Sequence, residues 1–461
     1  MPRKVLTRMI TQNYSAEQSK TEISLTLAKL RVAKLLQKSN IRKANGVSVM
    51  EIFQFLLLLA FYGKNLFRVL ASERERTGIS KNTFYRFLNT STYNWKRFLV
   101  LLAVKVTDAF GKLTNHNRVK VLILDDSVTP RQRSKAVELL ARIHDHVFNR
   151  YVKGFNMLTL GWSDGFSFVP VAFNLLSSAK PQNRYQEASN TIDHRTSGWK
   201  ARIDSMLTKP EAAFQMIKYA LDMGIKADYV LMDSWFTTEP FVKSLAGLGI
   251  HVIGMVKQLT QTYLYNGRYY TLPKLASLVM DKRSGSIYRS IVVRTKRENI
   301  PVRIVFVRNR NKRSEYLYIM ATDVSMPDTE VIRLYGNRWS IETFFKASKS
   351  LLKLENEFQT RSYDAAVAHT AIVFTRYMVL EWIRRDNNDP RTYGGLFFAL
   401  CDEVQDIEFA EALKSLMELL MNIAMNFDSE NTSTIKSKVT YWINSQPRFI
   451  KALLPNLGWE S

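Results

Sequence analysis

Apolar residues recur at three- and four-residue spacings along the N-terminal part of the chain. This spacing is found in Ile23 to Leu36, Met50 to Leu70 and Phe98 to Val106. An amphipathic helix shows one face at this period, so residues 1–117 are predicted to be helical. Within them Ser80 precedes KNTFYRFL as an N-cap. That short helix is either a recognition helix for DNA bases or an ordinary capped helix with a solvated polar face.

The pattern changes to that of strands near residue 118. Three stretches are rich in β-branched and aromatic residues: VKVLILDDS, FNMLTLGW at 155–162 and FSFVPVAFNLL at 166–176. A helix follows at about 199–223, broken or kinked at Pro210, and further strands are predicted at 229–234 and 251–256. Strands followed by alternating helices and strands predict an α/β architecture for residues 118–256.

A β-rich segment then interrupts this alternation. Residues 257–322 contain the stretches RYYTL, SIYRSIVVRT, PVRIVFVRN and EYLYIMATD, and are predicted to form an all-β insertion. Residues 323–385 return to helices and are assigned to the second part of the α/β core. Residues 386–461 are predicted to be a helical C-terminal region, in which Glu403 to Asn426 either contacts a second copy or packs within the chain.

Charge and composition narrow the choice of partners and of chemistry. The 461 residues carry 66 Lys and Arg against 41 acids, so the net charge is +25 and a polyanionic partner is expected. The single cysteine, Cys401, excludes an intrachain disulfide and a cysteine-based zinc cluster, and suits the cytoplasm. The sequence has no Gly-x-Ser-x-Gly elbow, phosphate-binding Gly-Lys-Ser/Thr loop or dinucleotide fingerprint, which argues against esterases, ATPases and oxidoreductases.

Two of the predicted strands end in an acid followed by serine. Four apolar residues precede Asp125, Asp126 and Ser127, and four residues of a second strand precede Asp233 and Ser234. Continuous apolar runs are typical of strands buried on both faces. Each Asp-Ser alone is explained by a turn or a helix cap, but two such strand ends in one basic chain favour a functional site.

A third acid lies on the predicted helix of the 330s and 340s. At about 100° per residue, Tyr335, Arg338, Glu342 and Lys349 fall within roughly 60° of one another. Arg338 and Glu342 are alternatively an ordinary i,i+4 pair on a solvated face. Three converging carboxylates would repel one another unless divalent cations such as Mg²⁺ were bound. Arg338, Lys346 and Lys349 would then neutralise DNA phosphates.

These residues resemble the DDE transposases of bacterial and archaeal insertion sequences, specifically the insertion sequence four family. Tyr335, Arg338, Glu342 and Lys349 match that family's C-terminal signature in all four residues and all three gaps. The segments LDDS at 124–127 and MDSWF at 232–236 support the match, as does the β-rich stretch before Glu342.

The resemblance implies a ribonuclease H-like catalytic core, interrupted by an insertion, with helical regions at both ends. It implies a catalytic triad of Asp126, Asp233 and Glu342 that binds two Mg²⁺ ions, for which Mn²⁺ can substitute. It further implies that Tyr335, Arg338 and Lys349 contact the DNA backbone at the transposon end. The reaction is expected to be cut-and-paste transposition on double-stranded DNA at terminal inverted repeats, through a hairpin intermediate and a synapsed homodimer.

Some alternatives stay open at the level of sequence. Neighbouring strand residues face opposite sides, so only one of Asp125 and Asp126 points into the site, and the family pattern of an acid before Ser favours Asp126. The aromatic residue that would stack on a flipped base is unassigned. Competing functions are a DNA-binding protein that no longer cuts and a two-metal nuclease without strand transfer.

Overall fold

The computed structural model describes residues 21–72, 79–113, 118–145, 148–257, 261–279, 288–308, 316–354 and 361–425, together with residues 437 and 441. The first 20 residues, and most of the predicted C-terminal region after residue 425, lie outside this description. In the described part, none of the helices combines the length and the apolar character that crossing a membrane requires.

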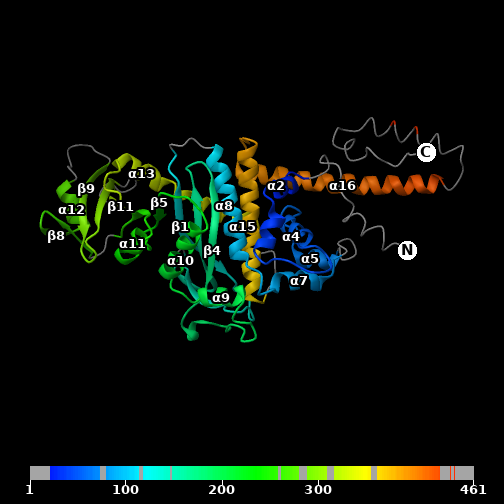
Figure 1. Cartoon of the computed structure of the whole chain (residues 1–461), viewed down its shortest axis with the longest axis horizontal. Coiled ribbons are helices and arrows are strands. Elements are labelled where there is room, and N and C mark those ends of the chain that lie inside the picture. Colours follow the sequence, from blue (N-terminus) through cyan, green and yellow to red (C-terminus); the bar gives the residue numbers. More distant parts are fainter. Residues whose placement is uncertain are drawn as a thin grey trace.

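The described structure is built on a single mixed sheet of eleven strands, whose β8–β9 end lies at the left of Figure 1. Its order is β2-β3-β1-β5-β6-β11-β10-β9-β7-β8, and β4 pairs with β3 off this path. The strands are β1 (Val121–Pro130), β2 (Ala141–Asp145), β3 (Arg150–Ser163), β4 (Phe168–Leu176), β5 (Tyr229–Met232), β6 (His251–Met255), β7 (Thr262–Tyr265), β8 (Arg268–Thr271), β9 (Tyr288–Thr295), β10 (Pro301–Arg308) and β11 (Tyr316–Ala321).

The middle of the sheet is buried on both faces. Strand β1 runs parallel to β5, which runs parallel to β6, while β3 pairs with β1 in the antiparallel direction. The continuous apolar run predicts complete burial, and its four residues are indeed fully buried: Val121, Leu122, Ile123 and Leu124. The mixed α/β architecture is therefore as expected.

The helices cover this sheet and extend beyond it. They are α2 (Glu22–Lys29), α3 (Val32–Lys38), α4 (Val49–Leu58), α5 (Leu66–Ser72), α7 (Lys81–Asn89), α8 (Trp95–Leu113), α9 (Ser197–Asp204), α10 (Lys209–Asp222), α11 (Glu239–Ala246), α12 (Leu272–Val279), α13 (Asp328–Gly336), α14 (Trp339–Ser350), α15 (Tyr363–Asp386) and α16 (Tyr393–Met425). Helices α8 and α15 pack on β4, and α15 stands between the sheet and the N-terminal helices (Figure 1).

The insertion differs from the all-β prediction. Helix α12 lies between β8 and β9, and Leu272, Leu275 and Ala276 on one face of it are buried. That i, i+3, i+4 spacing is helical, but the helix has only eight residues and is flanked by strands on both sides. The strands of the insertion also extend the central sheet through the β6–β11 pairing, instead of forming a separate layer.

The predicted continuous helix of the 330s and 340s is two helices. Helix α13 ends at Gly336 and α14 begins at Trp339. Between them, Asn337 N–H donates to the carbonyl of Leu334 and Arg338 N–H to that of Tyr335, which are tighter bonds than an α-helix makes. The polar stripe predicted from the sequence therefore crosses a helix junction.

A buried arginine joins the N-terminal helices to the end of α14. Arg376 of α15 has 0% exposure. Its guanidinium donates to the carbonyls of Leu56 and Leu57 at 2.6 and 2.8 Å, and to that of Leu352 at 2.8 Å. These carbonyls lie at the C-terminal ends of α4 and α14, where the helix dipole favours a cation. The chain thus fixes α14 relative to α4 through one side chain.

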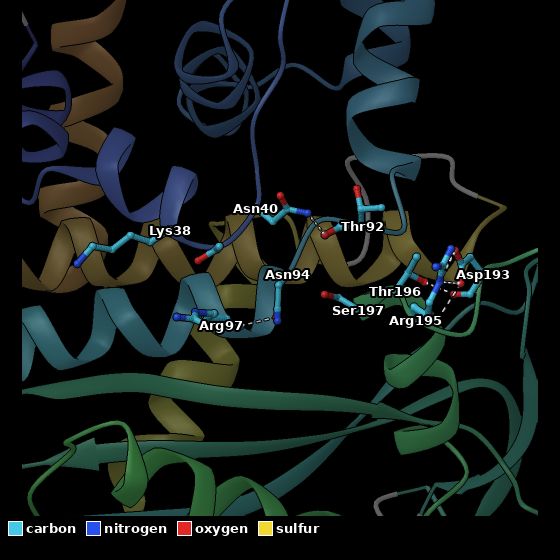
Figure 2. Close-up of a pocket in the computed structure, with 10 residues that line it drawn as sticks. Lys38, Asn40, Thr92, Asn94, Arg97, Asp193, Arg195, Thr196 and Ser197 are labelled. Atoms are coloured by element: carbon cyan, nitrogen blue, oxygen red, sulfur yellow. Dashed lines mark hydrogen bonds and ion pairs between the residues drawn. The ribbon is translucent and has the colours of Figure 1, made fainter.

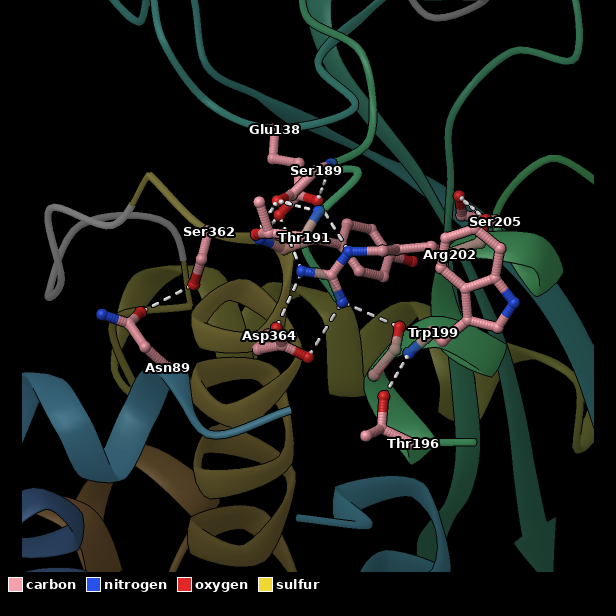
Figure 3. Close-up of polar contacts among 12 residues, drawn as sticks. Asn89, Glu138, Ser189, Thr191, Thr196, Trp199, Arg202, Ser205, Ser362 and Asp364 are labelled. Atoms are coloured by element: carbon pink, nitrogen blue, oxygen red, sulfur yellow. Dashed lines mark hydrogen bonds and ion pairs between the residues drawn. The ribbon is translucent and has the colours of Figure 1, made fainter. Parts of the chain in front are cut away.

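A second buried cluster ties the loop after β1 to α9 and α15 (Figure 3). Arg202, 1% exposed, donates to both carboxylate oxygens of Glu138 at 2.6 and 2.8 Å. The same guanidinium bonds both oxygens of Asp364 at 3.1 and 2.7 Å. Glu138 also accepts the backbone N–H groups of Ser189 and Tyr363. Because every charge is paired and hydrogen-bonded, the cluster can be buried.

Candidate active site

Strand β1 sends its two adjacent acids to opposite faces of the sheet. The Asp126 carboxylate accepts from Asn156 Nδ2 at 2.8 Å and from Lys209 Nζ at 3.0 Å. The Asp125 carboxylate instead accepts from Arg338 Nη1 at 3.0 Å. The two aspartates therefore have different partners, as the alternation of strand side chains requires.

Arg338 connects the acid of β1 with the acid of α14. Its Nη1 lies 3.0 Å from Asp125 Oδ2, and its Nη2 lies 2.5 Å from Glu342 Oε1. The side chains of Asp125 and Arg338 are each 17% exposed, and that of Glu342 is 35% exposed. The structure thus brings Asp125, Arg338 and Glu342 together in a half-buried group.

Asp233 lies next to this group, at the end of the neighbouring strand. Leu124 of β1 pairs with Met232 of β5 in the parallel register, so Asp125 and Asp233 follow at the same level. Asp233 Oδ1 accepts the backbone N–H of Trp235 at 2.9 Å, which fixes the carboxylate in the turn after β5. Asp233 therefore belongs both to the Asp-Ser turn predicted from the sequence and to the candidate site.

The electrostatics of the site show how closely these acids interact. Burial raises the pKa of Asp125 to about 7; the Arg338 charge opposes this rise, and the charges of Asp233 and Asp126 add to it. Burial also raises the pKa of Tyr335 to about 12, with Arg338 opposing and Asp233 contributing. Asp233 therefore lies within electrostatic reach of both Asp125 and Tyr335, and the Tyr335 phenol is protonated at neutral pH.

The residues predicted to contact DNA lie around Asp125, Arg338 and Glu342, and their side chains differ in how far they are exposed to solvent. The Arg338 guanidinium is 6.0 Å from the centre of the Tyr335 ring. Lys349 Nζ donates to the carbonyl of Val128 in β1 at 2.8 Å, so it lies close to the end of that strand. Lys346 is exposed on α14. The site therefore combines acids inside with basic groups at its margin.

Two polar neighbours of Asp126 were not expected from the sequence. Lys209 begins α10 and reaches Asp126 from 83 residues away, while its Nζ lies 4.7 Å from the centre of the Trp235 ring. Asn156 reaches the same carboxylate from β3. Neither contact follows from a local spacing. The Lys209 ammonium neutralises the Asp126 carboxylate, and Lys209 and Asn156 both donate hydrogen bonds to it.

The donor set fits a hard divalent cation by its chemistry. Asp125, Asp233 and Glu342 offer only carboxylate oxygens, the ligands that Mg²⁺ prefers. The raised pKa of Asp125 shows that the charge of Arg338 does not fully offset the effect of burial on this carboxylate. Among the described residues, no three histidine, cysteine, aspartate or glutamate side chains already stand at ligand spacing. The guanidinium of Arg338 lies between two of the acids, Asp125 and Glu342.

Comparison with known proteins gives two family matches. A model described as "DDE superfamily endonuclease" matches residues 42–272, and one described as "Transposase DDE domain" matches residues 210–379. No curated protein matches the chain. A solved structure, "Drosophila P element transposase strand transfer complex", is similar at 10% identity over 84% of this chain and 92% of that chain, with a TM-score of 0.23.

Proposed function

The chain belongs to the DDE superfamily of endonucleases, and we propose that it is the active transposase of an insertion sequence, of the insertion sequence four type. One observation carries the proposal: Arg338 pairs with both Asp125 of β1 and Glu342 of α14, and Asp233 directly follows β5, the strand next to β1 in the sheet. The spacing of Tyr335, Arg338, Glu342 and Lys349 supports the same family. The core would be ribonuclease H-like.

We propose Asp125, in place of Asp126, as the acid contributed by β1. Asp125 shares Arg338 with Glu342 and interacts with Asp233. Asp126, favoured by the sequence pattern alone, faces Asn156 and Lys209 instead.

Asp125, Asp233 and Glu342 would hold two Mg²⁺ ions, or Mn²⁺ in their place. Such ions, when bound, lower the pKa of a water or 3′-hydroxyl and stabilise the leaving oxygen of a phosphodiester. Arg338 would release the two acids and pair with a DNA phosphate, for which its planar fork is suited. The protonated Tyr335 phenol would donate a hydrogen bond to the same backbone, and Lys346 and Lys349 would add positive charge.

The substrate would be double-stranded DNA at the terminal inverted repeats and then at the target. The enzyme would nick each end, close a hairpin and transfer the ends, as a homodimer on synapsed DNA. The hairpin step requires a base out of the stack, held by an aromatic ring. Trp339 is 66% exposed and adjoins Arg338 in sequence, so we propose it for that stacking.

The products formed from labelled DNA carrying the element's own ends, in Mg²⁺, test this function. The transposase is expected to give 3′-end nicks, hairpins and joined target products. Glu342→Gln should abolish all three while end binding persists, because it removes one acid and no DNA contact. Nicks without hairpins or joined products would indicate a nuclease without strand transfer. Binding without nicks by the unaltered protein would indicate a DNA-binding protein that no longer cuts.

A further inference from the structure

A polar hollow of about 490 Å³ lies apart from the acids, between the N-terminal helices and the α/β core. Three segments line it: the end of α3, the loop that leads into α8, and the loop that leads into α9 (Figure 2). It carries three cations, Lys38, Arg97 and Arg195, and one acid, Asp193. Asp193 already pairs with Arg195 at 2.8 Å, so the hollow keeps an excess of positive charge.

Two helices begin at this hollow. Asn94 caps α8, because its Oδ1 accepts the backbone N–H of Arg97 at 2.9 Å. Thr196 caps α9, because its Oγ1 accepts the backbone N–H of Trp199 at 3.2 Å. Figure 2 shows Asn94 and Thr196 on segments that approach the hollow from different sides. The positive ends of two helix dipoles therefore add to the charge of the side chains.

A buried hydroxyl in the wall supplies an independent observation. Ser39 lines the hollow and is 1% exposed, yet its Oγ has no hydrogen-bond partner. Its backbone carbonyl accepts the N–H of Asn94 at 3.0 Å, which places Ser39 against the start of α8. Buried polar groups almost always have partners. An oxygen of a ligand in the hollow would satisfy this hydroxyl.

The start of α8, at the hollow, is joined to the sheet that carries the candidate active site. Asp126 of β1 pairs with Leu158 of β3, and Leu158 pairs with Asn174 of β4. Lys96, in the first turn of α8, donates to Asn174 Oδ1 at 3.3 Å. A chain of contacts through β4 and β3 therefore joins the start of α8 to β1.

We propose that this hollow binds a phosphate of the DNA backbone. The inference rests on the proposed function, since it takes DNA as the substrate. Lys38 and Arg97 would supply charge, the starts of α8 and α9 would supply N–H donors, and Ser39 would supply a hydroxyl. The contact involves no base, so it fixes the register of the duplex without reading its sequence.

The salt dependence of DNA binding tests the site. The variant Lys38→Gln with Arg97→Gln removes two exposed charges. Each phosphate contact contributes about 0.9 to the slope of log K against log salt, so the slope should fall by about 1 to 2 and binding at 0.1 M salt should weaken about tenfold. The matched control is Lys218→Gln with Lys243→Gln, which removes two exposed charges already paired with acids elsewhere. Its slope should stay close to that of the unaltered protein.

Ser39→Ala separates a ligand contact from a structural role. It deletes only the hydroxyl, so the proposal expects DNA binding to weaken several-fold with no loss of thermal stability. If the Lys38 and Arg97 double variant kept the slope of its control, or Ser39→Ala bound DNA normally, the phosphate site would be refuted. Nicking by the unaltered protein would then leave the proposed function standing; a chain that neither bound nor nicked DNA would refute both.

Discussion

Replacing Glu138 by Gln should destabilise the fold far more than replacing an exposed glutamate. The Glu138 carboxylate receives four donors: two from Arg202 and the backbone N–H groups of Ser189 and Tyr363. Each of its two oxygens accepts two of them. Whichever way the Gln amide is oriented, its NH₂ therefore faces two donors, and Arg202 keeps only Asp364 as a charged partner.

The expected loss is about 3–5 kcal/mol of unfolding free energy, the usual cost of removing one partner of a buried ion pair. The hydrogen bonds from Arg202, opposed by burial, hold the pKa of Glu138 below its ordinary value. The folded state thus favours the carboxylate, so its contribution is complete above the ordinary pKa. That contribution is lost as the pH falls through the lower pKa of the folded protein.

Urea unfolding at neutral pH measures the effect, with Glu187→Gln as the control. The Glu187 side chain is 62% exposed in its pair with Arg184, and such pairs contribute about 0–1 kcal/mol. The difference between Glu138→Gln and the unaltered protein should shrink below about pH 4. Equal midpoints for the two Gln variants would show that the cluster does not stabilise the fold as described.

Two further substitutions test the buried charges. Asp125→Asn removes a carboxylate that burial keeps from ionising easily. In the presence of a chelator the variant should therefore gain on the order of 1–2 kcal/mol of stability. A lower melting temperature than that of the unaltered protein in chelator would contradict this. Arg376→Met leaves the carbonyls of Leu56, Leu57 and Leu352 without their donor, so stability should fall by about 3 kcal/mol or more; a loss below about 1 kcal/mol by thermal unfolding would count against the link between α4 and α14.

Much of the sheet follows from local pattern. The apolar runs before Asp125 and Asp233 predicted β1 and β5, because strands buried on both faces have no polar alternation. The contact between Arg338 and Glu342 also follows from their i,i+4 spacing at the start of α14. The choice between Asp125 and Asp126 does not, because it depends on which face of β1 receives α14, and that is a property of tertiary packing.

The features that sequence did not predict join distant segments. Arg202 is 64 residues from Glu138 and 162 from Asp364, so no periodicity relates them. Lys209 reaches Asp126 across 83 residues. The break between α13 and α14 was hidden because Tyr335, Arg338 and Glu342 keep a helical spacing across it. Local patterns predict elements, whereas these contacts arise only when the elements pack.

Strand cleavage by Asp125→Asn and Asp126→Asn, measured side by side on labelled end DNA in Mg²⁺, tests the central claim most directly. Both variants should first be shown to fold and to bind the DNA. Asp125→Asn is expected to reduce nicking to background, because it removes one of the three acids grouped around Arg338. Asp126→Asn is expected to retain nicking, because its carboxylate is held by Asn156 and Lys209 on the other face. Nicking by Asp125→Asn together with its loss in Asp126→Asn would contradict this account of the site.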